Sequence, residues 1–169
     1  MIHPLIVFGA VTESRPTPPM ISFVAPSGTG KTTLLESVIA HLTDLGYRVA
    51  AVKHDAHRIE LDTEGKDSWR LRVAGASDTL LVGRNQIAWM GSVDEGPPLD
   101  VLVEVFCGSA DLIVVEGFRS AGLDTIRVQR PEVNDPTWTP PDPGRVIATL
   151  RPDDIDAAVD LIIERYLTG

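Results

Sequence analysis

Residues 20–33 read Met-Ile-Ser-Phe-Val-Ala-Pro-Ser-Gly-Thr-Gly-Lys-Thr-Thr, and this stretch decides the fold of the chain. Its apolar start is typical of a buried strand, and the apolar spacing that follows predicts a helix running to about Leu45. The loop between them fits the pattern G-x-x-x-x-G-K-[ST], except that Ala25 stands at the first glycine. A strand, a glycine-containing loop and a helix in this order predict a P-loop that binds phosphate.

The residues of this loop are expected to share the binding of a polyphosphate. The glycines let consecutive backbone N–H groups turn inward, and the N-terminus of the helix adds positive charge at the same point. Lys31 is expected to bridge the β- and γ-phosphates, and the hydroxyl of Thr32 to bind Mg²⁺. An ordinary Ser/Gly loop between a strand and a helix is the alternative. The predicted nucleotide-binding residues of this segment are Ser27, Gly28, Thr29, Gly30, Lys31, Thr32 and Thr33.

Composition bounds the class of protein and its partners. The 169 residues are 43% apolar, enough for a sizeable core, and no apolar run is long enough to span a bilayer. The formal net charge of −9 argues against nucleic acid as a partner, because binding its backbone requires a broad basic face. The single cysteine, Cys107, cannot form an internal disulfide and lies in an apolar run. We therefore expect a core residue at this position and a reducing, cytoplasmic location, with neither nucleic-acid nor membrane partner.

Two regions are expected along the chain. Residues 1–19 predict an extended or disordered leader, because they lack the basic start of a signal peptide and end in Ser-Arg-Pro-Thr-Pro-Pro. An edge strand added to the sheet is the alternative, and Met20 is a second candidate for the first residue of the protein. Residues 20–169 predict one P-loop nucleotide-binding domain.

After the P-loop, strand and helix patterns alternate. Gly46 ends the first helix and a buried strand follows at residues 48–54, which completes a βαβ unit. Such units predict an α/β fold of the P-loop NTPase type, with a mainly parallel sheet and helices on both faces. Residues 131–144 contain five prolines and predict an irregular surface loop. Further strands are expected at residues 79–82, 86–90, 112–116, 126–130 and 146–149, and further helices at 68–74, at 99–106 and from Asp153 or Asp154 onward.

A second informative stretch, residues 111–117, reads Asp-Leu-Ile-Val-Val-Glu-Gly. Its continuous apolar run is typical of a central parallel strand, and it ends in a carboxylate. Ligands of open α/β sheets bind at the carboxyl ends of the strands, where P-loop proteins use an acidic residue to hold Mg²⁺. We therefore expect Glu116 to act with Lys31 in catalysis and with Thr32 in binding the metal. A solvated glutamate at a strand end is the alternative.

Lys53 and His54 follow the second strand and are candidates for the same site. A cation and an imidazole at this place are expected beside the nucleotide or an anionic substrate. A metal site formed by His54 and His57 is a less favoured alternative, because no cysteine pair or histidine-rich tract lies nearby. A solvated loop is the other alternative.

Residues 62–68 contain the remaining candidates. We expect Lys66 and the start of the next helix, at Asp67, to contact an anionic group, with Asp62 or Asp67 near the magnesium ion. The simpler interpretation is a turn in which Asp67 acts as the N-cap of the helix.

Four motifs occur in a fixed order along the chain. They are Ala-Pro-Ser-Gly-Thr-Gly-Lys-Thr-Thr-Leu-Leu at 25–35, Val-Lys-His-Asp-Ala-His at 52–57, Asp-Thr-Glu-Gly-Lys-Asp-Ser-Trp-Arg-Leu-Arg-Val-Ala-Gly-Ala at 62–76, and Val-Val-Glu-Gly-Phe-Arg at 114–119. Together they resemble the molybdopterin-guanine dinucleotide biosynthesis protein B (MobB) family over about residues 20–150. The resemblance implies a dimeric adaptor that binds GTP and Mg²⁺ and hydrolyses GTP weakly. Its implied partner is the guanylyltransferase that attaches GMP to molybdopterin.

Other function classes stay open at this point. The guanine-reading motif Asn-Lys-x-Asp is absent, so the choice of base comes from the resemblance. A small-molecule kinase is the second class, with Arg70, Arg72 and Arg84 as candidates for a lid. A GTPase that delivers a metal is the third and least favoured class, because the chain lacks a Cys- or His-rich segment. The expected hairpin of residues 79–90 either pairs with a second chain or extends the protein's own sheet.

Overall fold

The computed structural model describes residues 16–55, 62–91, 93, 96–118, 121–133, 138–140 and 142–168. Contacts within the chain define two compact units. The first contains the described residues up to His54 and from Leu99 onward, and the second lies within Asp55–Pro98.

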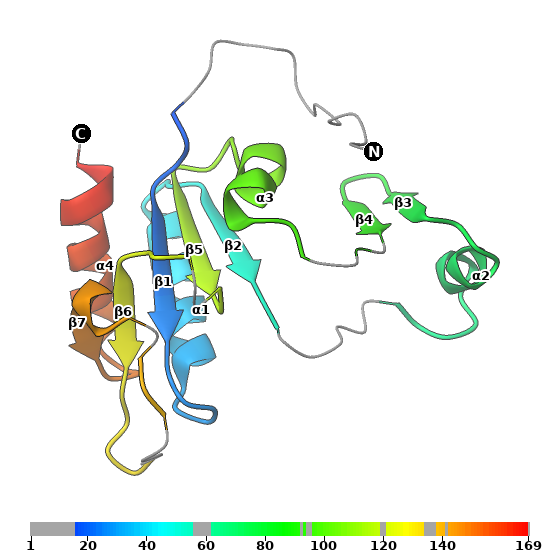
Figure 1. Ribbon diagram of the computed structural model, residues 1–169. Helices are drawn as coiled ribbons and strands as arrows, with labels where there is room; N and C mark the ends of the chain where they lie inside the picture. The colour runs from blue at the N-terminus through cyan, green and yellow to red at the C-terminus, as the bar shows by residue number, and fades with distance from the viewer. Residues whose placement is uncertain are drawn as a thin grey trace. The chain divides into compact units, whose positions relative to one another are not determined.

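A five-stranded parallel sheet forms the centre of the first unit, in the order β2–β5–β1–β6–β7 (Figure 1). The central strands β1 and β5 are apolar and almost completely buried, as expected for strands that are covered on both faces. This arrangement confirms the predicted α/β class and its mainly parallel sheet. The strands are β1 (Met20–Val24), β2 (Val49–Lys53), β5 (Leu112–Glu116), β6 (Thr125–Val128) and β7 (Val146–Leu150).

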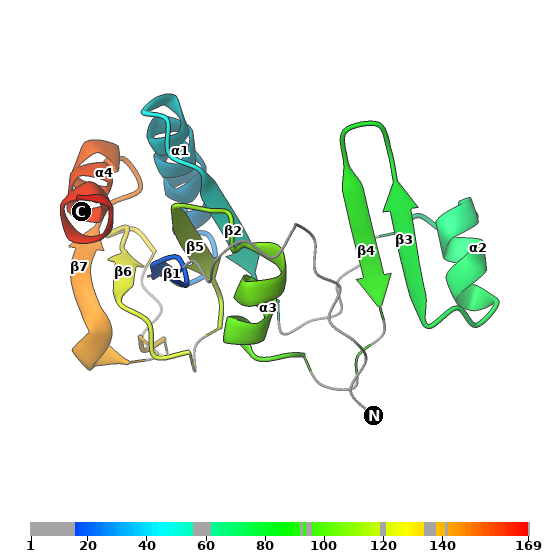
Figure 2. The ribbon, with the colours of Figure 1, turned by 90° about the horizontal axis from the view of Figure 1, so that it is seen from above.

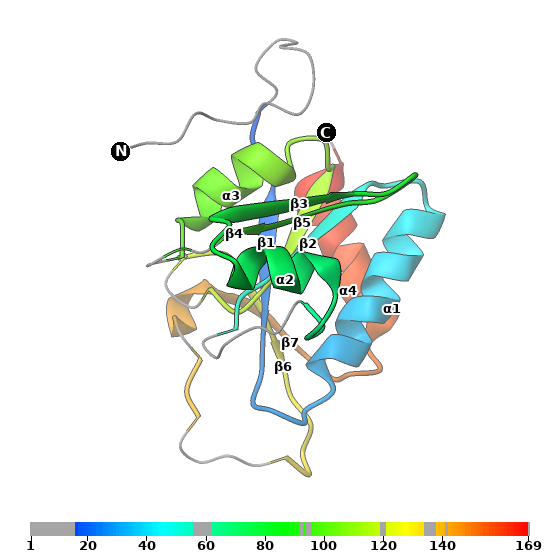
Figure 3. The ribbon, with the colours of Figure 1, turned by 90° about the vertical axis from the view of Figure 1, so that its right-hand side faces the viewer.

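Helices cover both faces of this sheet, as Figure 2 shows from above. Helices α1 (Lys31–Asp44) and α4 (Ile155–Ile162) pack side by side on one face, and α3 (Leu99–Phe106) lies on the other (Figure 3). Side chains alternate accordingly, because Phe23 and Val114 pack with α1 and α4 whereas Ile113 and Val115 pack with α3. The prediction of helices on both faces is confirmed.

Two details near the end of the chain differ from the sequence prediction. The expected irregular loop ends in a 3₁₀ helix, Pro143–Arg145, because the Asp142 carboxylate accepts a hydrogen bond from the Gly144 N–H at 3.1 Å. Asp154 stands at the N-cap position of α4, but its carboxylate accepts from the Arg151 N–H at 2.8 Å instead of capping the helix. Helix α4 continues as a π-helical turn, Ile163–Leu167.

The second unit consists of α2 (Asp67–Val73) and an antiparallel hairpin of β3 (Asp78–Val82) and β4 (Ile87–Gly91). The hairpin is the predicted one, with Leu80 opposite Trp89 in its register. Its two strands form a separate sheet over the described ranges. The alternative that the hairpin extends the protein's main sheet is therefore wrong, because β3 and β4 pair only with each other there.

Two further sequence expectations concern single features of the chain. None of the helices in the described part of the chain is long and apolar enough to cross a membrane. Cys107 is half-buried and packs against the apolar cluster under α3. Burial raises the pKa of its thiol, which favours the neutral form over a reactive thiolate.

Candidate functional site

The loop after β1 has the backbone geometry of a phosphate-binding loop. Gly28 and Gly30 have φ angles of 76° and 91°, in the left-handed region that favours glycine. Thr29 is buried, and its hydroxyl donates to the Pro26 carbonyl oxygen at 2.8 Å, which closes the loop. Gly30 is the N-cap of α1 and has no side chain to cap it, so the first N–H groups of the helix are left for a ligand.

Lys31 and Glu116 meet at the carboxyl edge of the sheet. The Lys31 Nζ atom lies 2.7 Å from Glu116 Oε1, and the two side chains are only 20% and 14% exposed. Strand register explains the meeting, because β1 and β5 are parallel neighbours in which Phe23 pairs with Glu116. The structure therefore brings together the two residues that the sequence assigns to catalysis.

Strand β2 adds a second lysine from the other side of β5. Lys53 pairs with Glu116 in the register, and its Nζ atom lies 3.8 Å from the same oxygen that binds Lys31. Glu116 thus faces two positive charges while carrying one negative charge. Within this cluster of three side chains the positive charges outnumber the negative one, which favours the binding of an anionic group.

His54 fixes the backbone beside Glu116. Its N–H donates to the Glu116 carbonyl oxygen at 2.7 Å, and its ring packs against Phe118 with the ring centroids 4.7 Å apart. A Cβ atom at Gly117 would overlap the backbone of His54, so glycine is required there. Of the residues predicted beside the nucleotide, Lys53 and His54 therefore lie next to Glu116.

Thr32 and Glu116 offer oxygen ligands of the kind that Mg²⁺ prefers. Thr32 is exposed in the first turn of α1, and Glu116 ends β5. Within the described residues, no group of three or more His, Cys, Asp or Glu side chains could hold a metal by itself. This donor set fits Mg²⁺, which takes most of its ligands from water and phosphate. The alternative site of His54 and His57 includes His57, which is outside the described residues.

Asp62 lies in the second unit, where its carboxylate accepts three hydrogen bonds. Its carboxylate accepts hydrogen bonds from the Ser68 hydroxyl at 2.9 Å, from Arg72 Nε at 3.2 Å and from the Thr63 N–H at 3.0 Å. Burial acts to raise the pKa of Asp62, but these hydrogen bonds outweigh it and lower the pKa. Asp62 therefore ties the segment before α2 to the helix.

Lys66 and Asp67 stand at the start of α2. Lys66 is the N-cap residue with an extended backbone, and Asp67 is the first helical residue, 3.7 Å from Arg70. The interpretation of Asp67 as the N-cap is therefore wrong, because the N-cap is the preceding residue, Lys66. Both side chains are exposed.

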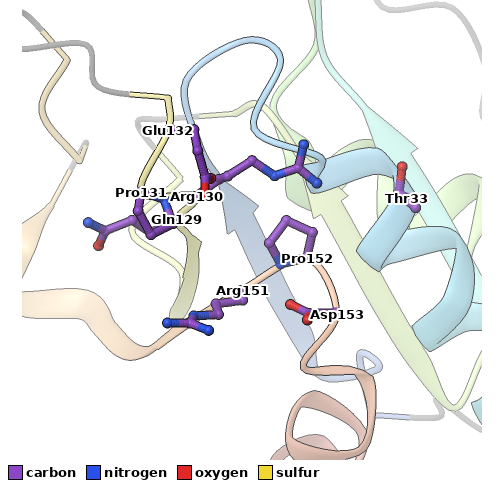
Figure 4. Close-up of a pocket in the computed structure, with 8 residues that line it drawn as sticks. All are labelled: Thr33, Gln129, Arg130, Pro131, Glu132, Arg151, Pro152 and Asp153. Atoms are coloured by element: carbon purple, nitrogen blue, oxygen red, sulfur yellow. The ribbon is translucent and has the colours of Figure 1, made fainter.

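A hollow of about 460 Å³ adjoins the phosphate loop (Figure 4). Its walls are Thr33 of α1, residues 129–132 after β6 and residues 151–153 after β7. A Cβ atom on Gly30 would lie 3.0 Å from the Pro152 side chain, so the hollow begins at the phosphate loop itself. The sequence analysis did not identify residues 129–132 and 151–153 as site residues. Their positions directly after parallel strands could have indicated a ligand site, because ligands bind at that edge of such sheets.

The parallel sheet, the glycine loop between β1 and α1, and the lysine–carboxylate pair define an α/β protein of the P-loop NTPase class. Residues 20–151 match the family described as Molybdopterin guanine dinucleotide synthesis protein B (MobB). The chain belongs to this family, as the order of its four sequence motifs indicated.

Related proteins and solved structures agree with this assignment. A protein of Haemophilus influenzae named molybdopterin-guanine dinucleotide biosynthesis adapter protein is 36% identical over 139 residues, which are 82% of this chain and 78% of the relative. The Escherichia coli protein of the same name is 39% identical over 104 residues, 60% of this chain and 59% of the relative. The crystal structure of Bacillus subtilis MobB superimposes with a TM-score of 0.66 at 25% identity, covering 89% of this chain and 99% of that one.

Proposed function

We propose that this protein is an adapter in molybdopterin-guanine dinucleotide biosynthesis that binds GTP with Mg²⁺ and hydrolyses it slowly. The family match over residues 20–151 and the names of the two bacterial relatives support the adapter role. The observation that carries the nucleotide part is the 2.7 Å contact between Lys31 and Glu116 beside the glycine loop. P-loop proteins use these residue types, at these positions, for triphosphate and magnesium.

Nucleotide binding would rearrange this ion pair. The phosphates, bound at the N-terminus of α1, offer Lys31 a more highly charged partner than Glu116. Lys31 would then contact the β- and γ-phosphates, and the Glu116 carboxylate would be free to hold Mg²⁺ together with the Thr32 hydroxyl. The bound ion would neutralise phosphate charge. Lys53 stays beside Glu116 and keeps the edge positive.

Slow hydrolysis is part of the proposal. P-loop proteins hydrolyse nucleotide slowly until a water-orienting residue and an additional cation complete the site. Glu116 contacts two lysines through one oxygen, so we assign it no water-orienting role. Lys66 and Asp67 remain proposed contacts for an anionic group, and Asp62 a proposed magnesium ligand. Asp62 would have to give up part of its hydrogen bonding for that role.

The proposed partners are the guanylyltransferase that attaches GMP to molybdopterin and a second copy of this chain. The second unit supports a homodimer, because several large apolar side chains of α2 and the hairpin are exposed there. Each hairpin strand also has one edge without a neighbouring strand in the described chain. We place the protein in the cytoplasm, where nucleoside triphosphates are available. The exposed side chains are Leu71, Val73, Leu80, Leu81, Val82 and Ile87.

A capture experiment tests the adapter proposal. The full chain, immobilised with and without GTP and Mg²⁺, is offered the purified guanylyltransferase, and nucleotide turnover is followed in parallel with a panel of phosphate-acceptor metabolites. We expect capture of the enzyme and slow turnover that no metabolite accelerates. Lys31→Ala is the matched variant for the dependence on nucleotide. Rapid turnover in proportion to one metabolite, without capture, would contradict the adapter role in favour of a kinase.

A further inference from the structure

We propose that the hollow beside the phosphate loop holds the base of the nucleotide, and that Glu132 selects guanine. This inference rests on the proposed function, because it assigns the second half of the same ligand. Neither the family resemblance nor the names of the relatives identify residues that contact the base.

The position of the hollow fits a nucleoside attached to a phosphate in the P-loop. Thr33 follows Lys31 and Thr32 in the first turn of α1 and forms one wall. The Pro152 side chain lies 3.0 Å from the position that a Cβ atom on Gly30 would occupy. The remaining walls follow β6 and β7, at the carboxyl edge where ligands of parallel sheets bind. A volume of about 460 Å³ lies within the range of small-molecule sites.

Two surfaces of the hollow suit a flat aromatic base. Figure 4 shows the Arg130 side chain extended toward the start of α1, with the Pro152 ring beside it. The Arg130 Nη2 atom would lie 3.5 Å from a Cβ on Gly30, so the guanidinium reaches the phosphate loop. A planar guanidinium stacks on aromatic rings and also attracts phosphate. Arg130 can therefore contact either the base or the adjoining phosphate.

The carboxylates at the hollow favour guanine over adenine. Glu132 and Asp153 line it, and neither side chain has a hydrogen-bond partner among the described residues. Guanine presents two adjacent donors, N1–H and the 2-amino group, which one carboxylate can accept together. Adenine has an acceptor at N1 and no 2-amino group, so the same carboxylate would repel it.

Chain order assigns the selection to Glu132. The segment directly after β6 reads Gln129-Arg130-Pro131-Glu132, that is, an amide, a cation, any residue and a carboxylate. The guanine-reading motif Asn-Lys-x-Asp has the same sequence of chemical groups. Gln, Arg and Glu retain the chemistry of Asn, Lys and Asp with different lengths or head groups. Asp153 lies in a different segment, beside Asp154 at the start of α4.

Base selectivity of a Glu132→Gln variant tests the assignment. Affinities of the full chain for ribose-labelled fluorescent GTP, ATP and XTP are measured with Mg²⁺. Xanthine has an oxygen in place of the 2-amino group, so a glutamine can donate to it and still accept from N1–H. We expect the wild type to prefer GTP, and Glu132→Gln to lose GTP affinity by about tenfold or more while gaining XTP affinity. Glu36→Gln, an exposed glutamate of α1 outside the hollow, is the matched control and should leave all three affinities unchanged.

The outcomes separate this inference from the proposed function. A wild type that binds GTP, with the same preference in Glu132→Gln, would overturn the role of Glu132 and leave nucleotide binding intact. A switch to XTP in Asp153→Asn but not in Glu132→Gln would also overturn it. A wild type that binds none of the three nucleotides would contradict the proposed function and this inference together.

Discussion

Glu116 holds two lysines at the end of β5, and this charge balance determines how the site responds to nucleotide. Lys31 is the closer partner, at 2.7 Å, and Lys53 lies 3.8 Å from the same oxygen. The carboxylate holds the Lys31 side chain at the carboxyl edge of the sheet before the phosphates bind. It also competes with them for the ammonium group, so Glu116 has opposite effects on phosphate binding and on magnesium binding.

Replacing Glu116 by Gln should separate these two effects. The change keeps the shape of the side chain but removes its charge, so Lys31 is no longer held away from the phosphates. We expect binding of GTP without magnesium to be retained or slightly increased. Magnesium-dependent hydrolysis should fall by at least about tenfold, because the carboxylate ligand is lost. Equal and small changes in both quantities would leave Glu116 with a structural role only.

Asp124 anchors the end of the chain to the loop before β6. Its carboxylate accepts hydrogen bonds from Arg165 Nη2 at 2.8 Å and from the Tyr166 hydroxyl at 2.9 Å. Burial acts to raise the pKa of Asp124, but the hydrogen bonds from Tyr166 and Arg165 outweigh it and hold the pKa below its ordinary value of 3.8. A carboxyl group with a lowered folded-state pKa stabilises the protein fully above its unfolded-state pKa, and this contribution is lost as the pH falls through the lower folded-state pKa.

Asp124→Asn should therefore destabilise the protein in a pH-dependent way. At pH 7 we expect a loss of about 1 to 2 kcal/mol in the free energy of unfolding, since charge-assisted hydrogen bonds are lost. The difference between variant and wild type should shrink as the pH falls below about 4, because the carboxyl group of the unfolded chain then binds a proton while that of the folded protein is still ionised. Urea unfolding at pH 7 and pH 3 measures both values. A difference that is the same at both pH values would contradict the role assigned to the charge.

At the scale of elements, the phosphate loop depends on two glycines for different reasons. Gly28 has a φ of 76° and open space where a Cβ would lie, whereas Gly30 has a φ of 91° and the Pro152 side chain 3.0 Å from that position. Gly28→Ala should cost about 1 kcal/mol of backbone strain. Gly30→Ala should cost about 2 kcal/mol or more, because it adds a collision to the strain. Urea unfolding of this matched pair tests the packing of the loop against the segment after β7, and equal losses would contradict it.

The sequence predicted best those elements whose own residue pattern shows how they are buried. The apolar runs of β1 and β5 predicted buried parallel strands, and the loop pattern predicted the helix that begins at Lys31. The meeting of Lys31 with Glu116 could be predicted because the carboxyl ends of parallel strands share one edge. The position of Lys53 beside Glu116 depends on β2 pairing with β5, and a single sequence does not contain that strand order.

The hollow after β6 and β7 was not predicted, for a physical reason. Its walls are short polar segments without apolar periodicity, and they come together only because β6 and β7 pair in the sheet. The start of α2 shows a smaller error of the sequence prediction, which placed the N-cap one residue too late. Asp67 has the chemistry of an N-cap, but the helix already includes it, because Lys66 adopts the extended backbone of the cap position.

At the scale of the whole molecule, the hairpin unit should determine the oligomeric state. Ile87 is 57% exposed on β4, and a charge there would be buried in any dimer that uses this sheet. Ile87→Asp should convert a dimer into a monomer in light scattering at micromolar concentration. Val101→Asp on α3, where an apolar side chain is 44% exposed in the first unit, is the control and should leave the dimer intact. A wild type that is already monomeric, or an unchanged dimer in Ile87→Asp, would contradict this role of the hairpin.

Calorimetric titration of the full chain and its Lys31→Ala variant with GTP and Mg²⁺ tests the central claim most directly. Lys31 is the residue that links the phosphate loop to Glu116. We predict that the wild type binds and that the variant, still folded by circular dichroism, loses about 2 to 4 kcal/mol of binding free energy, as expected for an oriented charge in a closed site. A folded Lys31→Ala protein that binds GTP as tightly as the wild type would contradict the assignment of this loop as the nucleotide site.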